Sequence, residues 1–237
     1  MWIFSIVVAA FFNILAPVNL TIMKLLTIFL FSLLFSYHAG AQSRLVKFTT
    51  SKGEITVMLY DKTPKHRDMF LSSIKSGLYR DALFNRVIKS FVSQAGELDE
   101  SILEREKQHP ELPLKRVAAE IDTALFHKKG ALGAGRNDNP EKSSYINQIY
   151  FVAGKIHTDA QLDAIEKRKG SKFSKKQREV YKTIGGTPHL DGDYTVFGEI
   201  ITGMDVAEAI NSVQTNKDDL PLEPVLFNIK TIKKNRR

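Results

Sequence analysis

The chain has 237 residues, of which 43% are hydrophobic and none is a cysteine, so disulfides, thiolate nucleophiles and Cys-based zinc sites are excluded. Its formal net charge is +8, and the basic residues are spread along the sequence, with a run only at the end from Lys233 to Arg237. No aromatic residue interleaves with that run, so it offers no platform for stacked bases. Solvated surface lysines therefore explain the charge better than specific nucleic-acid binding.

Residues 1–41 form an apolar leader in which Lys24 is the only charged residue. Its second half has the layout of a secretory signal. Met23 and Lys24 give a positive start, an apolar stretch follows from Leu25 to Phe35, and small residues at 39–41 precede Gln42. The sequence therefore predicts cleavage before Gln42 and delivery of the globular part, residues 42–237, to the periplasm or cell envelope.

The first apolar run, from Trp2 to Leu15, carries no basic residue and has two interpretations. The preferred one is that translation begins at Met23, so that residues 1–22 are an upstream extension. The alternative is a membrane anchor from Trp2 to Ile22, which would attach the protein to a membrane only if the leader is not cleaved. Polar and helix-breaking residues in this run count against a spanning helix: Asn13, Pro17 and Asn19.

The globular part opens with a predicted β-hairpin followed by a helix. Leu45 to Thr50 alternates in polarity like a strand, and after a tight turn residues 55–60 form the returning strand. Thr63 is expected to be the N-cap of the helix, because Pro64 suits the first helical position, and Gly77 is expected to end it.

The rest of the chain is predicted to form short strands and one more core helix, over residues 205–213. Two polar insertions interrupt this pattern. Residues 97–129 are expected to be a surface excursion with some helix, and residues 155–188 to be helical over 160–167 and 175–182. Further strands are predicted at residues 83–88, 91–94, 131–134, 149–152, 194–201 and 225–232. Many short strands with only two core helices indicate a barrel or a sandwich.

Residues 84–96, FNRVIKSFVSQAG, combine an arginine with strongly apolar neighbours. If this segment is a regularly alternating strand, Phe84, Arg86 and Ile88 point to the same side. From this spacing alone, the better interpretation of Arg86 is a rim residue whose aliphatic stem covers apolar surface.

The same segment resembles the active-site signature of the cyclophilins, F-H-R-V-I-x-x-F-M-x-Q-G-G. The matching positions are Phe84, Arg86, Val87, Ile88, Phe91, Gln94 and Gly96. The departures are Asn85 for the His, Val92 for the Met and Ala95 for the first Gly. Other short segments resemble the family in the same order along the chain: residues 51–53, 59–60, 63–64, 130–132, 148–150, 189–192, 195–200 and 203–206. Because several motifs occur in order, the resemblance is more specific than any one of them.

The resemblance implies a mostly β fold, an eight-stranded antiparallel barrel capped by two helices, with the two partly helical insertions added to it. It also implies peptidyl-prolyl cis/trans isomerase activity, which requires no metal and no cofactor. The expected partners are unfolded or partly folded proteins with exposed X-Pro segments, and the expected state is a monomer. The histidines show no metal-binding spacing such as H-x-x-x-H, so a metal site is not expected.

Transferred position by position, the resemblance implies that the catalytic residues are Arg86, Phe91 and Gln94. Arg86 is expected to stabilise the twisted amide of the X-Pro bond, and Gln94 to hold Arg86 or to bond the substrate backbone. The substrate-binding residues are expected to be Val92, Gly135, Tyr150, His189, Leu190 and Tyr194. Phe91 together with three of these would form the apolar socket for the proline ring: Val92, Tyr150 and Leu190.

Two functions are compatible with these residues. One is an active isomerase that assists the folding of exported proteins, since Arg86, Phe91 and Gln94 are all present. The other is a non-catalytic proline-peptide-binding or chaperone module on the same scaffold, since Val92 and Ala95 depart from the signature near the groove.

Overall fold

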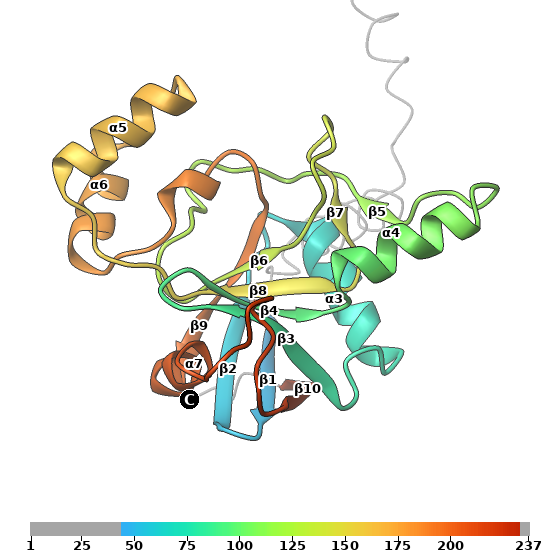
Figure 1. Ribbon diagram of the computed structural model, residues 1–237. Coiled ribbons are helices and arrows are strands. Elements are labelled where there is room, and N and C mark those ends of the chain that lie inside the picture. Colours follow the sequence, from blue (N-terminus) through green and yellow to red (C-terminus); the bar gives the residue numbers. More distant parts are fainter. Residues whose placement is uncertain (1–43, 233–237) are drawn as a thin grey trace, which may run out of the picture. The chain divides into compact units, whose positions relative to one another are not determined.

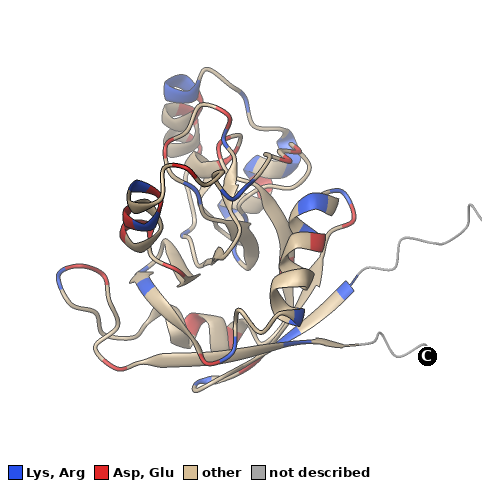
Figure 2. Cartoon of the chain, turned by 90° about the vertical axis from the view of Figure 1, so that its right-hand side faces the viewer, with Lys and Arg blue, Asp and Glu red and all other residues tan. Residues whose placement is uncertain are grey.

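The computed structural model describes residues 44–232, which form one compact unit. The predicted leader with its cleavage site, and the basic run after residue 232, lie outside the described residues. Figure 2 shows that basic and acidic residues are interspersed along the helices and loops. No helix in the described part of the chain is long and apolar enough to cross a membrane.

Eight antiparallel strands close into a barrel in the order β1-β10-β3-β4-β8-β6-β9-β2 (Figure 1). The strands are β1 (Arg44–Thr50), β2 (Gly53–Leu59), β3 (Ala82–Ile88), β4 (Val92–Gly96), β6 (Ala131–Ala134), β8 (Gln148–Val152), β9 (Val196–Thr202) and β10 (Val225–Ile232). Closure pairs every strand on both sides, so the barrel leaves no open edge for another chain to join. The predicted eight-stranded antiparallel barrel is confirmed, and the predicted hairpin is β1 and β2.

Large aromatic rings fill the inside of the barrel. The ring centroids of Phe48 and Phe151 lie 5.1 Å apart, and those of Phe84 and Phe227 lie 5.0 Å apart. The two core helices are α3 (Pro64–Lys75) and α7 (Met204–Asn211). Helix α3 packs against β9 and β10, and α7 packs against β2, β3 and β4, so the two helices cover different parts of the barrel.

The N-terminus of α3 is capped by a residue from the first insertion. The Glu120 carboxylate accepts hydrogen bonds from the backbone N–H groups of Lys65, at 3.0 Å, and His66, at 2.9 Å. Thr63 occupies the N-cap position, but its side chain makes no capping hydrogen bond. The expected N-cap position of Thr63 is therefore confirmed, but a carboxylate from 54 residues further along, and not the Thr63 side chain, satisfies the free N–H groups.

A β-bulge lies in the middle of the motif strand. In the β3–β4 ladder, Phe84 pairs with Ala95 but Arg86 pairs with Gln94, so the register shifts at Asn85. As a result Phe84 and Val87 both enter the core, while Arg86 does not. The expectation that Phe84 and Arg86 share one side is wrong, because the extra residue of a bulge breaks the regular alternation.

The first insertion packs against the rest of the domain. It contains α4 (Asp99–Gln108) and β5 (Arg116–Val117), and β5 pairs with β7 (Ser144–Tyr145) in a second, two-stranded sheet. Ile102 on α4 is buried, and so is Phe126 near the end of the insertion. The description of residues 97–129 as a surface excursion is therefore only partly right, because apolar residues anchor it.

The second insertion forms two short helices with strong local start signals. These are α5 (Asp159–Lys169) and α6 (Lys175–Thr183), each beginning with a capping box, and they lie on the opposite side from α4 in Figure 1. Leu162 and Tyr181 pack with Phe126 in a small core of their own. A 3-10 turn, η1 (Pro188–Leu190), then leads the chain back to the barrel.

Candidate active site

The predicted site residues surround a cavity of about 320 Å³ on the outer face of the barrel. Alternation along β8 sends Ile149 and Phe151 into the core and turns Tyr150 outward. The predicted residues that line the cavity are Arg86, Phe91, Val92, Gln94, Gly135, Tyr150, Leu190 and Tyr194. The structure thus brings together all of the predicted residues except His189.

The central part of the cavity is set by strand register. Arg86 on β3 lies opposite Gln94 on β4, and Gln94 lies opposite Tyr150 on β8. Three adjacent strands therefore place these three side chains in one row. Gln94 and Tyr150 are more than fifty positions apart in the sequence. They meet because β4 and β8 are neighbours in the barrel.

An apolar socket lies at one end of this row. Val92 and Tyr150 are buried together, and Phe91, Leu190 and Tyr194 pack against them. The Tyr150 ring fits because residue 133 is glycine: a Cβ at Gly133 would lie 2.2 Å from the ring. The predicted proline-binding residues thus form one contiguous apolar surface, although Val92 is shorter than the Met of the signature.

Arg86 keeps its charge available to the cavity. Its side chain is 39% exposed, and its Nη2 lies 3.6 Å from the Asp219 carboxylate, which is exposed to the same extent. No hydrogen bond joins the Arg86 and Gln94 side chains among those of the described residues. An ion pair this exposed neutralises little of the charge in water, so Arg86 presents a cation next to the socket.

Tyr150 is held by a hydrogen-bonded chain that sequence reasoning missed. Its hydroxyl lies 2.8 Å from His127 Nε2, and His127 Nδ1 lies 2.7 Å from Asp191 Oδ1. The Tyr181 hydroxyl of α6 donates to the other oxygen of Asp191, at 2.6 Å. Because a carboxylate only accepts, Nδ1 carries the proton, and in the neutral imidazole Nε2 accepts from Tyr150. Burial raises the pKa of Tyr150, so this hydroxyl stays protonated at neutral pH.

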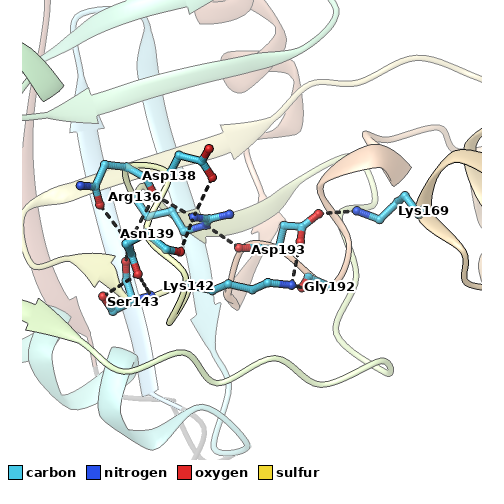
Figure 3. Close-up of polar contacts among 9 residues, drawn as sticks. Arg136, Asp138, Asn139, Lys142, Ser143, Lys169, Gly192 and Asp193 are labelled. Atoms are coloured by element: carbon cyan, nitrogen blue, oxygen red, sulfur yellow. Dashed lines mark hydrogen bonds and ion pairs between the residues drawn. The ribbon is translucent and has the colours of Figure 1, made fainter.

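A second guanidinium, Arg136, also lines the cavity and was not predicted. It lies 4.7 Å from the centroid of the Tyr194 ring, a cation–π contact. Its Nε donates to the Asp193 backbone carbonyl at 2.6 Å, and its Nη1 donates to that of Asn137 at 2.7 Å (Figure 3). These bonds fix Arg136 as a support for Tyr194, whereas Arg86 has fewer partners.

The far end of the cavity is polar and comes partly from the first insertion. Asp99 and Glu100 at the start of α4 line it, together with Gln148. Gln148 Nε2 donates to the Asp99 carboxylate at 2.5 Å. Asp99 and Glu100 could not be assigned from the motifs, because α4 belongs to an insertion without a counterpart in the signature.

His189 lies next to the cavity and not in its lining. Its ring stacks on Phe91, with centroids 5.3 Å apart and an interplanar angle of 23°. It lines a neighbouring cavity that also touches Phe91. Burial, helped by nearby positive groups, lowers the pKa of His189, so its ring is neutral at pH 7.

The fold and site together define a β-barrel domain that offers an apolar socket beside the guanidinium of Arg86. The family model for cyclophilin type peptidyl-prolyl cis-trans isomerases matches residues 45–233. The chain therefore belongs to the cyclophilin-type peptidyl-prolyl cis-trans isomerase family, and the expected family and enzyme class are confirmed.

Relatives from several bacteria carry the same activity in their names. The peptidyl-prolyl cis-trans isomerase of Acinetobacter baylyi is 27% identical over 209 residues, which cover 86% of this chain and 92% of that protein. Peptidyl-prolyl cis-trans isomerase A of Dickeya dadantii is 28% identical over 202 residues, covering 83% and 88%. Isomerase B of Escherichia coli is 23% identical over 193 residues, covering 79% and 99%.

Solved structures agree on the fold. The cyclophilin type isomerase of Cryptosporidium parvum, crystallised in the presence of the dipeptide Ala-Pro, has a TM-score of 0.57 at 18% identity. The alignment covers 80% of this chain and 99% of that one. Nearly the whole of that compact cyclophilin is therefore contained in this chain, which adds further segments to it.

Proposed function

We propose that this isomerase accelerates rotation about X-Pro bonds because Arg86 stabilises the twisted amide. The observation that carries the proposal is the row formed by Arg86, Gln94 and Tyr150 on three adjacent strands, with the apolar socket beside it. A proline ring in the socket lies within reach of a charged guanidinium, and no nucleophile or cofactor is needed.

The chemistry of the bond explains why a cation is effective. Rotation about a peptide bond has a barrier of about 20 kcal/mol, because the nitrogen is conjugated with the carbonyl. At the twisted transition state the nitrogen regains a lone pair. A donor aimed at that lone pair stabilises the transition state more than either planar ground state, and so lowers the barrier. A guanidinium is charged at any physiological pH, so Arg86 needs no proton transfer to act.

The surrounding residues have supporting roles in this proposal. Phe91, Val92, Tyr150 and Leu190 hold the ring, and Gln94, which is only 8% exposed, offers its amide to the substrate backbone. Because the aromatic residues are packed on one another, they restrict the ring to one orientation. A single ring orientation keeps the prolyl nitrogen next to the Arg86 guanidinium, so the charge stabilises the transition state selectively.

We further propose that the substrates are unfolded or partly folded exported proteins with exposed X-Pro segments, and that the protein acts on them as a monomer in the periplasm or cell envelope. The support for export is the apolar leader, with Lys24 near its middle and small residues before Gln42.

A protease-coupled assay on a proline-containing peptide tests the activity and its mechanism. The purified protein should accelerate the slow phase, and Arg86→Ala should reduce kcat/KM by about a hundredfold or more, as expected for loss of a preorganised charge. Arg80→Ala, which removes an exposed arginine that does not line the cavity, is the matched control and should leave the rate unchanged. Peptide binding without any acceleration would instead favour the non-catalytic module.

A further inference from the structure

A second cavity, of about 340 Å³, adjoins the proline socket. The two cavities share Phe91, and the consecutive residues His189 and Leu190 line one cavity each. The stacked rings of Phe91 and His189 therefore form the wall between them. A peptide chain that leaves the socket on this side passes directly over the second cavity.

The second insertion builds much of this cavity. The lining residues from α5 are Gln161, Ala164, Ile165 and Arg168. Lys155 lies before the helix, and Gly186 and Thr187 lie after the insertion's second helix. Without residues 155–188 the outer wall would be missing, so the cavity is a feature of this chain's own insertion.

The insertion is fastened to the socket at two points, so the cavity is preformed. Lys169, at the end of α5, donates to the His189 backbone carbonyl at 3.0 Å and also pairs with Asp193 (Figure 3). Tyr181 of α6 donates to Asp191, which in turn bonds the His127 that holds Tyr150. The position of the helices is thus linked to the position of the socket ring.

The charges that face this cavity have one sign. Lys155 and Arg168 line it, and no aspartate or glutamate does. Neither residue takes part in a salt bridge among the described residues, in contrast to Arg178 and Lys182 on the neighbouring helix. The positive field extends to the dividing wall, where Arg168 contributes to the lowered pKa of His189. The cavity therefore has two cations without a protein counter-ion.

One buried polar atom in the wall also lacks a partner. Thr187 is 2% exposed, and its hydroxyl has no hydrogen-bond partner in the structure. Nearly all buried polar groups in folded proteins are satisfied, so an exception calls for a reason. The Thr187 hydroxyl is therefore available to hydrogen-bond a polar ligand group bound near Lys155 and Arg168.

The direction of the bound chain follows from the proposed chemistry. If the prolyl nitrogen faces Arg86, the preceding residue, which is bonded to that nitrogen, leaves on the Arg86 side. The residues after the proline then have a route across Phe91 and His189, where the second cavity adjoins the socket. Three extended residues span about 10 Å, so the positions just after the proline are those that reach the second cavity.

We propose that the cavity between α5 and the proline socket is a second substrate subsite, which binds an acidic side chain located one to three residues after the proline. This subsite rests on the proposed function, since it takes its direction from the placement of the prolyl nitrogen beside Arg86. It gives the isomerase a preference among X-Pro segments that the socket alone cannot provide.

Binding and turnover of a peptide series test the proposal. Each peptide carries one X-Pro bond and one test residue, which is Glu, Gln or Lys. In different peptides the test residue stands at the first, second or third place after the proline, or before the proline. Affinity is measured by calorimetry with both the natural protein and Arg86→Ala. The best Glu peptide should bind about fivefold more tightly than its Gln counterpart, and more tightly still than its Lys counterpart, as expected for partly exposed ion pairs.

Charge reversal identifies the residues responsible. The double variant Lys155→Glu/Arg168→Glu should lose the preference for Glu and favour the Lys peptide. The matched control is Lys167→Glu/Lys175→Glu, which makes the same change of charge within the same insertion but away from the cavity lining, and it should keep the preference. The preference should also shrink as the salt concentration rises.

The outcomes separate this subsite from the proposed mechanism. Equal affinity for Glu and Gln peptides, or a preference that survives Lys155→Glu/Arg168→Glu, would overturn the subsite while leaving the Arg86 mechanism intact. A preference for Glu before the proline would overturn the assigned direction. Tighter binding of Glu peptides without catalysis by the natural protein would contradict the Arg86 mechanism alone, because the affinity measurement does not depend on turnover.

Discussion

Arg86 reaches the cavity because of a single bulged residue. Asn85 occupies the bulge, and its side-chain amide donates to the Gly96 carbonyl on the paired strand. Gly96 cannot be replaced easily, since it has a φ of +97° and a Cβ there would lie 1.8 Å from the Asn147 carbonyl oxygen. Ala95, by contrast, is fully buried in the core, so its methyl group is accommodated. The departures from the signature at residues 85 and 95 therefore leave the geometry of Arg86 intact.

At the same scale, the hydroxyl of Tyr150 is expected to stabilise the fold. Tyr150→Phe removes the hydrogen bond to His127 and leaves a buried ring nitrogen without its partner. The free energy of unfolding, measured by urea titration, should fall by about 1–2 kcal/mol. The apolar socket remains, so KM for a neutral proline peptide should change little.

Tyr79→Phe is the matched control for this prediction. Tyr79 is also buried, but its hydroxyl has no hydrogen-bond partner in the structure. Its removal should be neutral or slightly stabilising, because no bond is lost and a buried polar group disappears. Equal destabilisation by the two substitutions would contradict a structural role for the His127 bond.

At the scale of elements, the first insertion is joined to the barrel through the cap of α3. Glu120 binds two backbone N–H groups of the helix and also the His66 ring, whose Nδ1 lies 2.7 Å from the carboxylate. Burial lowers the pKa of His66 although Glu120 opposes this shift. Burial would raise the pKa of Glu120, but its hydrogen bonds from His66 and Lys65 outweigh this, and the pKa is lowered.

These two shifts predict that stability is lost on acidification. The folded pKa of His66 lies below its ordinary value of 6.5, so the unfolded chain binds the proton first and stability falls as the pH drops below about 6.5. The folded pKa of Glu120 lies below 4.5, so a further loss follows below that pH. Urea titrations between pH 7 and 4 should show the decline.

Glu120→Gln isolates the contribution of the charged cap. At pH 7 the variant should be about 1–2 kcal/mol less stable than the natural protein, since it loses a carboxylate at a helix N-terminus. The difference should narrow as Glu120 of the natural protein takes up its proton. Glu111→Gln, an exposed residue of the same insertion, should have no such effect. A stability difference that is independent of pH would contradict this account.

The elements differ in how well the sequence predicts them. The helices at 159–169 and 175–183 are close to their predicted ranges because each starts with a local capping box. The Glu120 cap and the β5–β7 pair could not be predicted, since their partners lie far apart in the sequence. Strand number and barrel closure came only from the family resemblance, because periodicity does not report which strands pair.

At the scale of the whole molecule, the cavity gathers residues from three separate stretches, around 86–100, 135–150 and 190–194. Motif order was sufficient to predict most of them, because each lies within or beside a signature segment. Arg136, His127 and Asp191 were missed as site residues for a physical reason. Their roles depend on side-chain contacts with Tyr194, Tyr150 and Tyr181, which no single segment reveals.

Export with removal of the leader is a proposal about the whole molecule, and the N-terminus of the exported protein can be measured. The protein recovered from the periplasm of its host should begin at Gln42, since small residues at 39–41 precede it. N-terminal sequencing or intact-mass measurement gives the answer directly. A chain that retains Trp2 to Ile22 and stays in the membrane fraction would favour the anchor interpretation instead.

The central claim is that Arg86 supplies catalysis and the socket supplies binding. The most direct test is exchange NMR on one proline peptide at equilibrium, which reads the cis/trans interconversion rate without a coupling protease, together with a titration of affinity. The account predicts that Arg86→Ala lowers the exchange rate by about a hundredfold or more while the affinity changes only a few-fold. Full exchange activity in Arg86→Ala, or a loss of rate explained entirely by lost affinity, would contradict it.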